Sequence, residues 1–397
     1  MTMTLPFAKI LKNGAAAVAL AGLAACAAVP TARHDFGPLT GAEIERGETV
    51  TVAMLLPQTA PNPEVQGLAR DMQAAANMAM ADLNGATLEL KFYDTAGNAD
   101  TASSVATQAI SDGAKLIVGP LYAENANAAG IAANAANVNV LAFSNASAIA
   151  EQNVFVMGNT LENVADRVVS FAKGRGINNI GVVYPSNFEG ELGRAAVETA
   201  VIKNGVTLAG AGTYEFSPEG VTTAAPQIVS ILKDKGAEQV VFSDNPEQSL
   251  TYIASALSEN GLNPAEVKYS GLTKWDGAGN ALSAPALQGG WFTLADPTIT
   301  AAFNSRFRDQ YGRNPHPLAA LAYDGVAAAG ALIGTGRSDA LTSKGLTRPG
   351  GFVGANGPFR FNANRIAERA LAVMEVRDGA AVMLDPAPRQ FGGGGLF

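Results

Sequence analysis

The stretch KLIVGPLYAENANAAG, residues 115–130, indicates the fold of this chain more clearly than any other. Its apolar residues lead into Gly119-Pro120, and an alanine-rich run of helical character begins a few residues later. A short apolar run that stops at a turn and continues into a helix is typical of a buried strand in a parallel sheet. Open α/β sheets bind ligands beyond the carboxyl ends of such strands. The residues after Val118 are therefore candidates for a binding site.

Strand-like and helix-like runs alternate on both sides of this stretch. TVAMLLP (51–57) and TLELKFYD (87–94) read as strands, and EVQGLARDMQAAANMAMADLN (64–84) between them has apolar residues at helical spacing. The pattern restarts at ENVADRVVSFAKGRG (162–176) and continues to GGWFTLA (289–295). We therefore expect an α/β fold of two doubly wound, Rossmann-like lobes.

Three crossings between the two lobes are predicted, near residues 147–160, 290–300 and 335–350, and together they would form a hinge. The expected divisions of the chain are a signal peptide (1–25), a flexible tether (26–48), a first lobe (49–158 and 297–340), a second lobe (159–296 and 341–391) and a disordered tail (392–397).

The composition excludes several classes of function. Of 397 residues, 48% are apolar and 16% are charged, and the net charge of -8 gives no electrostatic reason to expect nucleic acid as a partner. With one cysteine and two histidines, the chain cannot form an internal disulfide or a cysteine-based or multi-histidine metal site. We expect no metal and no cofactor.

The N-terminal segment predicts the compartment. Two lysines precede an unbroken run of small apolar residues (14–25), which is too short to span a bilayer but suits a signal peptide. The run ends in LAAC, which resembles the bacterial lipobox, with Cys26 as the lipidated residue. The alternative is an ordinary secretory peptide cleaved after Ala25. By the same resemblance, Ala27 after the cysteine favours anchoring in the outer membrane over the inner one, on the periplasmic side.

Signals of catalysis are weak. No Walker-type phosphate loop, G-x-G-x-x-G helix start or G-x-S-x-G motif is present. His316 lies between two prolines and fits the start of a helix better than a general base. Asp94 is interpreted as a turn residue or N-cap, and Asp324 as a structural helix residue. We expect that the chain is not an enzyme.

Polar and aromatic side chains follow the predicted strands. Tyr122 and Trp275 can stack on a flat ligand group or simply close the core. The polar cluster that contains Asn145 and Ser147 can offer hydroxyl and N–H groups to a carboxylate, or it can be a plain loop with a helix cap. The ligand-binding candidates are Tyr122, Asn145, Ser147, Asn245, Lys274 and Trp275.

Three segments together resemble the type I periplasmic binding proteins of the leucine/isoleucine/valine class. They are YDTAGNADTASSVATQAISDGAKLIVGPLYAENANAAGIAANAANVNVLAFSNAS, FNSRFRDQYGRNPHPLAALAYDGVAAAGAL and GPFRFNANRI. The resemblance implies a non-enzymatic lipoprotein that binds an amino acid or a related small polar or anionic solute for the permease of an ABC transporter. It also implies that Ser147 binds the ligand carboxylate and that Asn145 supplies a nearby backbone contact.

One departure from that family leaves an alternative open. The acidic residue that holds a ligand ammonium should follow VKYSG, but LTKW stands there, and Lys274 suits an anionic ligand instead. LQGGWFTLADPTITAAFNSRF and RIAERALAVMEV also resemble lipoprotein activators of penicillin-binding proteins. In that case the partner would be a penicillin-binding protein and the role would be regulation of peptidoglycan synthesis.

Overall fold

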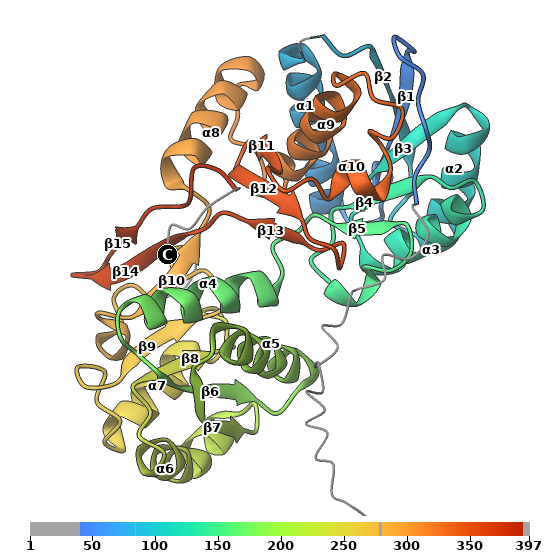
Figure 1. Cartoon of the computed structure of the whole chain (residues 1–397). Coiled ribbons are helices and arrows are strands. Elements are labelled where there is room, and N and C mark those ends of the chain that lie inside the picture. The colour runs from blue at the N-terminus through green and yellow to red at the C-terminus, as the bar shows by residue number, and fades with distance from the viewer. Residues whose placement is uncertain (1–39, 84, 278–279, 392–397) are drawn as a thin grey trace, which may run out of the picture. The chain divides into compact units, whose positions relative to one another are not determined.

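The computed structural model describes residues 40–83, 85–277 and 280–391 (Figure 1). The first lobe contains a five-stranded sheet of order β2-β1-β3-β4-β5 in which every neighbouring pair is parallel. Its strands are β1 (Val50–Leu56), β2 (Leu88–Asp94), β3 (Ala114–Val118), β4 (Asn139–Ala142) and β5 (Val154–Val156).

Helices cover both faces of this sheet because β1 is apolar on both of its faces. Met54 and Leu56 pack in the core formed with α1 (Pro63–Asp82) and α9 (Ala319–Ile333), which lie side by side in Figure 1. Leu55 points to the opposite face and packs against α2 (Ala99–Ser111) and α3 (Ala123–Asn134). Alternate residues of one strand thus serve two separate apolar layers.

The second lobe repeats the strand order of the first. Its sheet has the order β15-β14-β10-β9-β8-β6-β7, so β7-β6-β8-β9-β10 corresponds to β2-β1-β3-β4-β5. An antiparallel hairpin, β14 and β15, extends the sheet beyond β10. The strands are β6 (Asn179–Pro185), β7 (Thr207–Tyr214), β8 (Gln239–Phe242), β9 (Lys268–Gly271), β10 (Trp291–Leu294), β14 (Ala372–Arg377) and β15 (Ala380–Asp385).

Four helices cover this second sheet, two on each face. Helices α4 (Leu161–Gly174) and α5 (Phe188–Asn204) share one apolar layer, and α6 (Pro218–Asp234) and α7 (Leu250–Glu259) share the other. Two doubly wound α/β sheets with the same strand order confirm the predicted fold class. Within the described residues, no helix combines the length and the apolar character needed to cross a membrane.

Two short segments carry the chain from one sheet to the other and back to the helices of the first lobe. The chain passes from β5 to α4 through residues 157–160, and from β10 to α8 (Pro297–Tyr311) through residues 295–296. Helix α8 then packs against α1, since Phe303 and Phe307 share a cluster with Ala75 of α1.

The third crossing lies further along the chain than the sequence indicated. After α10 (Ser343–Leu346) comes a small antiparallel sheet of β11 (Phe352–Gly354), β12 (Gly357–Phe361) and β13 (Ala367–Arg369). Phe352, Phe359 and Phe361 are buried in the core of the first lobe together with Phe155 of β5. Residues 341–369 are therefore part of the first lobe, and the chain returns to the second lobe only between β13 and β14.

Part of the predicted tether is packed. Ile44 is 4% exposed and lies in the core of the first lobe, and the side chain of Asn139 donates to the carbonyls of Thr40 (3.1 Å) and Leu341 (2.9 Å). Residues 40–48 are thus not a flexible tether, because apolar burial and hydrogen bonds hold them on the first lobe. The signal peptide, Cys26, the remainder of the tether and the tail 392–397 lie outside the described residues.

A buried ion pair joins α9 to the end of β13. The Arg369 guanidinium donates to Asp324 Oδ2 at 2.8 Å, and the two side chains are 7% and 0% exposed. Asp324 Oδ1 accepts from the backbone N–H of Ala355 at 2.6 Å, and Arg369 Nε donates to the carbonyl of Met157 at 2.7 Å. As expected, Asp324 is a structural helix residue. The pair ties the first and third crossings together.

Asp324→Asn should destabilise the protein by about 3–5 kcal/mol, because the substitution leaves the buried Arg369 cation without a counter-charge. Equilibrium unfolding in urea measures this loss. Glu89→Gln is the control, since it removes the exposed Lys91–Glu89 pair (3.5 Å), worth about 0–1 kcal/mol, and leaves an amide oxygen that can still accept from the Thr51 hydroxyl. Equal unfolding midpoints for the two variants would contradict the role given to the buried pair.

Candidate functional site

The strand of the opening stretch, β3, ends at Val118, and the next position, Gly119, requires glycine for a steric reason. Gly119 has φ +93°, and a Cβ at this position would lie 2.4 Å from the carbonyl oxygen of Leu55. Only glycine combines that backbone conformation with such close approach. The turn brings Tyr122 to the N-cap of α3, where it is 39% exposed at the carboxyl edge of the sheet.

Asp94 acts at the same edge as a turn residue. Its Oδ2 accepts from the Thr59 hydroxyl at 2.6 Å, and its Oδ1 accepts from the N–H of Ala96 at 2.8 Å. Burial alone would raise the pKa of this carboxyl, but the hydrogen bonds from Thr59 and the backbone outweigh burial and lower it. Asp94 therefore holds two loops together as an ionised carboxylate.

The polar cluster after β4 contacts the second lobe. Ser144 is 7% exposed and its hydroxyl accepts from the N–H of Ala146, whereas Asn145 is exposed. Ser147, the first residue of a short 3-10 helix (Ser147–Ile149), donates its hydroxyl proton to Glu162 Oε1 at 2.6 Å. Glu162 lies in the first turn of α4, beyond the first crossing. The hydroxyl predicted to meet a ligand is thus already bound to a carboxylate.

A buried polar cluster lies at the carboxyl end of β8. Asp244 is 3% exposed, and its Oδ1 accepts from the hydroxyls of Tyr214 and Ser249, while its Oδ2 is buried and has no hydrogen-bond partner among the described residues. Burial raises the pKa of the Asp244 carboxyl, and burial beside Asp244 raises the pKa of the Tyr214 hydroxyl. The Thr273 hydroxyl donates to the Asp244 carbonyl at 2.8 Å, which links the ends of β8 and β9. The cluster fixes the loops of this edge.

Two predicted ligand residues of the second lobe lie at this edge. Asn245 is half-buried, and its side-chain oxygen accepts from the N–H of Glu247 at 3.1 Å, as in an Asx turn. Lys274 is exposed, and within residues 40–83, 85–277 and 280–391 its ammonium makes no hydrogen bond or ion pair. Lys274 therefore remains available to an anionic group.

Trp275 is a core residue. It is 1% exposed, and its ring stacks on Phe292 with centroids 5.5 Å apart. Two glycines make room for the indole, since a Cβ on Gly271 would lie 2.5 Å from Nε1 and one on Gly290 would lie 2.7 Å from the ring. In this position the ring offers no face to a ligand, so we do not retain Trp275 in the proposed site.

Strand ends of the first lobe thus carry Tyr122, Asn145 and Ser147, and those of the second carry Asn245 and Lys274. Glu162 was missed by the sequence reasoning. An acidic residue in the first turn of a helix is common, because it stabilises the helix dipole, so local sequence gave no reason to pair Glu162 with Ser147.

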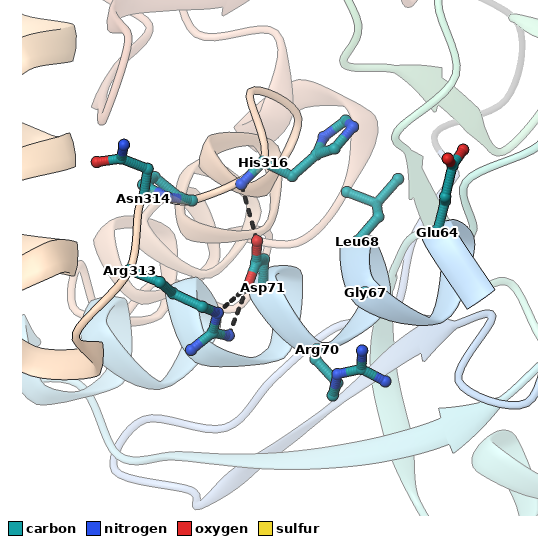
Figure 2. Close-up of a pocket in the computed structure, with 9 residues that line it drawn as sticks. Glu64, Gly67, Leu68, Arg70, Asp71, Arg313, Asn314 and His316 are labelled. Carbon is teal, nitrogen blue, oxygen red and sulfur yellow. Dashed lines mark hydrogen bonds and ion pairs between the residues drawn. The ribbon is translucent and has the colours of Figure 1, made fainter.

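A pocket of about 350 Å³ lies elsewhere, between α1 and the loop that joins α8 to α9 (Figure 2). Asp71, 8% exposed, accepts from the Arg313 guanidinium and from the N–H of His316 at 2.8 Å. His316 Nδ1 accepts from the N–H of Leu318, just before α9, as expected of a residue at a helix start. The pocket contains none of the predicted ligand residues, and we attribute its shape to the loop that Asp71 holds.

Among the described residues, no three His, Cys, Asp or Glu side chains are grouped to hold a metal ion.

Comparison with known proteins gives a family match and distant structural neighbours. Residues 49–381 match the model of a family described as periplasmic binding protein. An uncharacterized protein of Rickettsia prowazekii is 21% identical over 236 residues, or 58% of this chain and 62% of that relative. The chain therefore spans less than two thirds of the curated relative it matches.

Two solved structures illustrate the similarity in fold. A branched-chain amino acid ABC transporter periplasmic ligand-binding protein from Burkholderia xenovorans has a TM-score of 0.62 at 18% identity, covering 85% of this chain and 96% of that one. An ABC transporter solute-binding protein from R. palustris, in complex with 4-hydroxybenzoate, has a TM-score of 0.55 at 17% identity, covering 87% and 98%.

Gly271→Ala should destabilise the protein by about 1–3 kcal/mol, because the new methyl group would overlap the buried indole of Trp275. Intrinsic tryptophan fluorescence during urea unfolding measures the change. Gly277→Ala is the matched control from the same loop, since no atom of the described residues lies within 4 Å of its Cβ position. A Gly271→Ala protein as stable as this control would show that Trp275 is not confined.

Proposed function

The chain belongs to the periplasmic binding protein family, and from that premise we propose that it captures a small solute and delivers it to the permease of an ABC transporter. Members of this family are solute-binding proteins, and we propose that this chain acts without catalysis. The observation that carries the proposal is the pair of doubly wound lobes with one strand order, each with polar side chains beyond its strand ends.

Two lobes that share a hinge provide a mechanism for capture. A solute that contacts both lobes stabilises the closed arrangement, because those contacts are complete only when the lobes close. The buried Asp324–Arg369 pair keeps the first and third crossings in register, so that closure bends the crossings without separating them. A permease can then distinguish the loaded protein from the empty one by its shape.

We propose that the solute contacts Tyr122, Asn145 and Ser147 from the first lobe and Asn245 and Lys274 from the second. The exposed ring of Tyr122 offers apolar contact, while the other side chains offer hydrogen bonds and one positive charge. This set suits a small polar solute that carries a carboxylate, such as an amino acid. The solved relatives named above, a branched-chain amino acid transporter protein and a protein that holds 4-hydroxybenzoate, are consistent with that class.

The alternative role, activation of a penicillin-binding protein, is not favoured by the comparisons. The two structural neighbours named above are proteins of ABC transporters. We also propose that the mature protein is held in the periplasm by a lipid on Cys26, with the outer membrane preferred over the inner one.

Lys274→Glu should weaken any carboxylate-containing ligand at least tenfold, because it replaces an attractive charge with a repulsive one. A thermal-shift screen of amino acids, aromatic acids and cell-wall fragments would first find the ligand. A solute at 100 times its Kd adds about 2.7 kcal/mol of stability, which such a screen detects easily. Lys235→Glu is the control, since Lys235 is exposed at the C-terminal end of α6, the opposite end of that helix from the strand ends. If no compound in the screen raises the unfolding temperature, solute binding is contradicted.

Cys26→Ala should release the protein from the membrane fraction, because the lipid acceptor is gone. Incorporation of labelled palmitate and fractionation of the cell envelope measure this. The unfolding midpoint of the soluble part should stay the same, since Cys26 precedes both lobes. Palmitate labelling of the Cys26→Ala protein would rule out this anchor.

A further inference from the structure

We infer that Glu162 and Ser147 together form the receptor for a positively charged group of the solute, of the ammonium class. This inference rests on the proposed solute-binding function and specifies the ligand group that meets the first lobe. It differs from the expectation drawn from the family resemblance, in which Ser147 meets a carboxylate.

The position of the pair is the first argument. Ser147 follows β4 at the carboxyl edge of the first sheet, and Glu162 lies in the first turn of α4 of the second lobe. Both side chains are half-buried, and Ser147 Oγ lies 2.6 Å from Glu162 Oε1. A solute that reaches the predicted site on the first lobe therefore meets a carboxylate from the second lobe at the same point.

The direction of the hydrogen bond is the second argument. A serine hydroxyl has one proton and two acceptor lone pairs, and an ionised carboxylate has acceptors only. Ser147 gives its one proton to Glu162, so the hydroxyl can then only accept. Glu162 Oε2 makes no hydrogen bond within the described residues. The pair thus presents acceptors, and the group that complements them is a donor such as an ammonium.

The charge of the pair is the third argument. Among the described residues, Glu162 forms no ion pair with a lysine or arginine side chain. Two carboxylates that share one hydroxyl lie within a few ångströms of each other and repel strongly. A ligand carboxylate at Ser147 would have to displace Glu162, whereas an ammonium would neutralise it.

The proposed site then contains two opposite charges. Lys274, after β9, carries the positive one. Glu162 supplies the acidic group from a different element, at the first crossing. Lys274 is then available to the carboxylate of the same solute. A zwitterion would therefore bind with its ammonium at Glu162 and its carboxylate at Lys274.

The test is calorimetric titration of the wild-type protein with three forms of each proteinogenic amino acid: the free acid, the carboxamide and the N-acetyl derivative. The carboxamide keeps the ammonium and loses the carboxylate, and the N-acetyl derivative does the reverse. We expect at least one free acid and its carboxamide to bind, and its N-acetyl derivative to bind at least a hundredfold more weakly.

Glu162→Gln should weaken the free acid and the carboxamide at least tenfold, because glutamine keeps the acceptor for Ser147 and removes the charge. Glu219→Gln is the matched control, since Glu219 is an exposed acid in the first turn of α6. Equal unfolding midpoints for the two variants would establish that Glu162→Gln is folded.

The outcomes separate the inference from the function on which it rests. Binding of N-acetyl derivatives without binding of carboxamides would overturn the inference and leave solute binding intact. Unchanged affinity in Glu162→Gln would overturn the inference as well. Failure of every amino-acid form to bind the wild-type protein would overturn the inference and remove amino acids from the proposed function.

Discussion

The buried ion pair between Asp324 and Arg369 is the constraint on which the arrangement of the chain depends. It links residues 45 positions apart and brings the first half of α9 to the end of β13. Burying two charges is costly, and the cost is offset only when the remaining donors and acceptors are satisfied. Here Ala355 donates to Asp324 and Met157 accepts from Arg369, so most of the polar groups of the pair are used.

The residues around the ion pair are tightly packed. A Cβ on Gly354 would lie 2.1 Å from Asp324 Oδ1, so only glycine lets the backbone reach the carboxylate. Arg369 also stacks over Phe359 at 4.9 Å from the ring centroid, and its backbone exchanges hydrogen bonds with the side chain of Asn163 on α4. One residue therefore touches the core of the first lobe and the first helix of the second.

The sequence predicted the two sheets because their signals are local. Apolar runs such as residues 51–57 and 115–118, each followed by a helix, indicate buried parallel strands without knowledge of the partner. The third crossing was misplaced because Phe352, Phe359 and Phe361 lie in short hairpin strands that either core could bury. Trp275 was misread for the same reason, since the slot that hides it is made by Gly271 together with Gly290, which lies 15 positions away. Contacts between distant segments decide both cases.

In the candidate site, too, a contact between distant residues decides what the local sequence leaves open, here which group donates the proton of a hydrogen bond. Local sequence places Ser147 at a strand end, where a hydroxyl is equally able to donate and to accept. Glu162, 15 residues further and on the other side of a crossing, removes the first option. The chemical character of a site formed from two lobes therefore depends on the contacts between the lobes. A side chain of one lobe can occupy a hydrogen-bond donor or acceptor of the other, as Glu162 does with Ser147. A family resemblance predicts where a binding residue lies. The neighbour of that residue in this chain determines which ligand group the residue can receive.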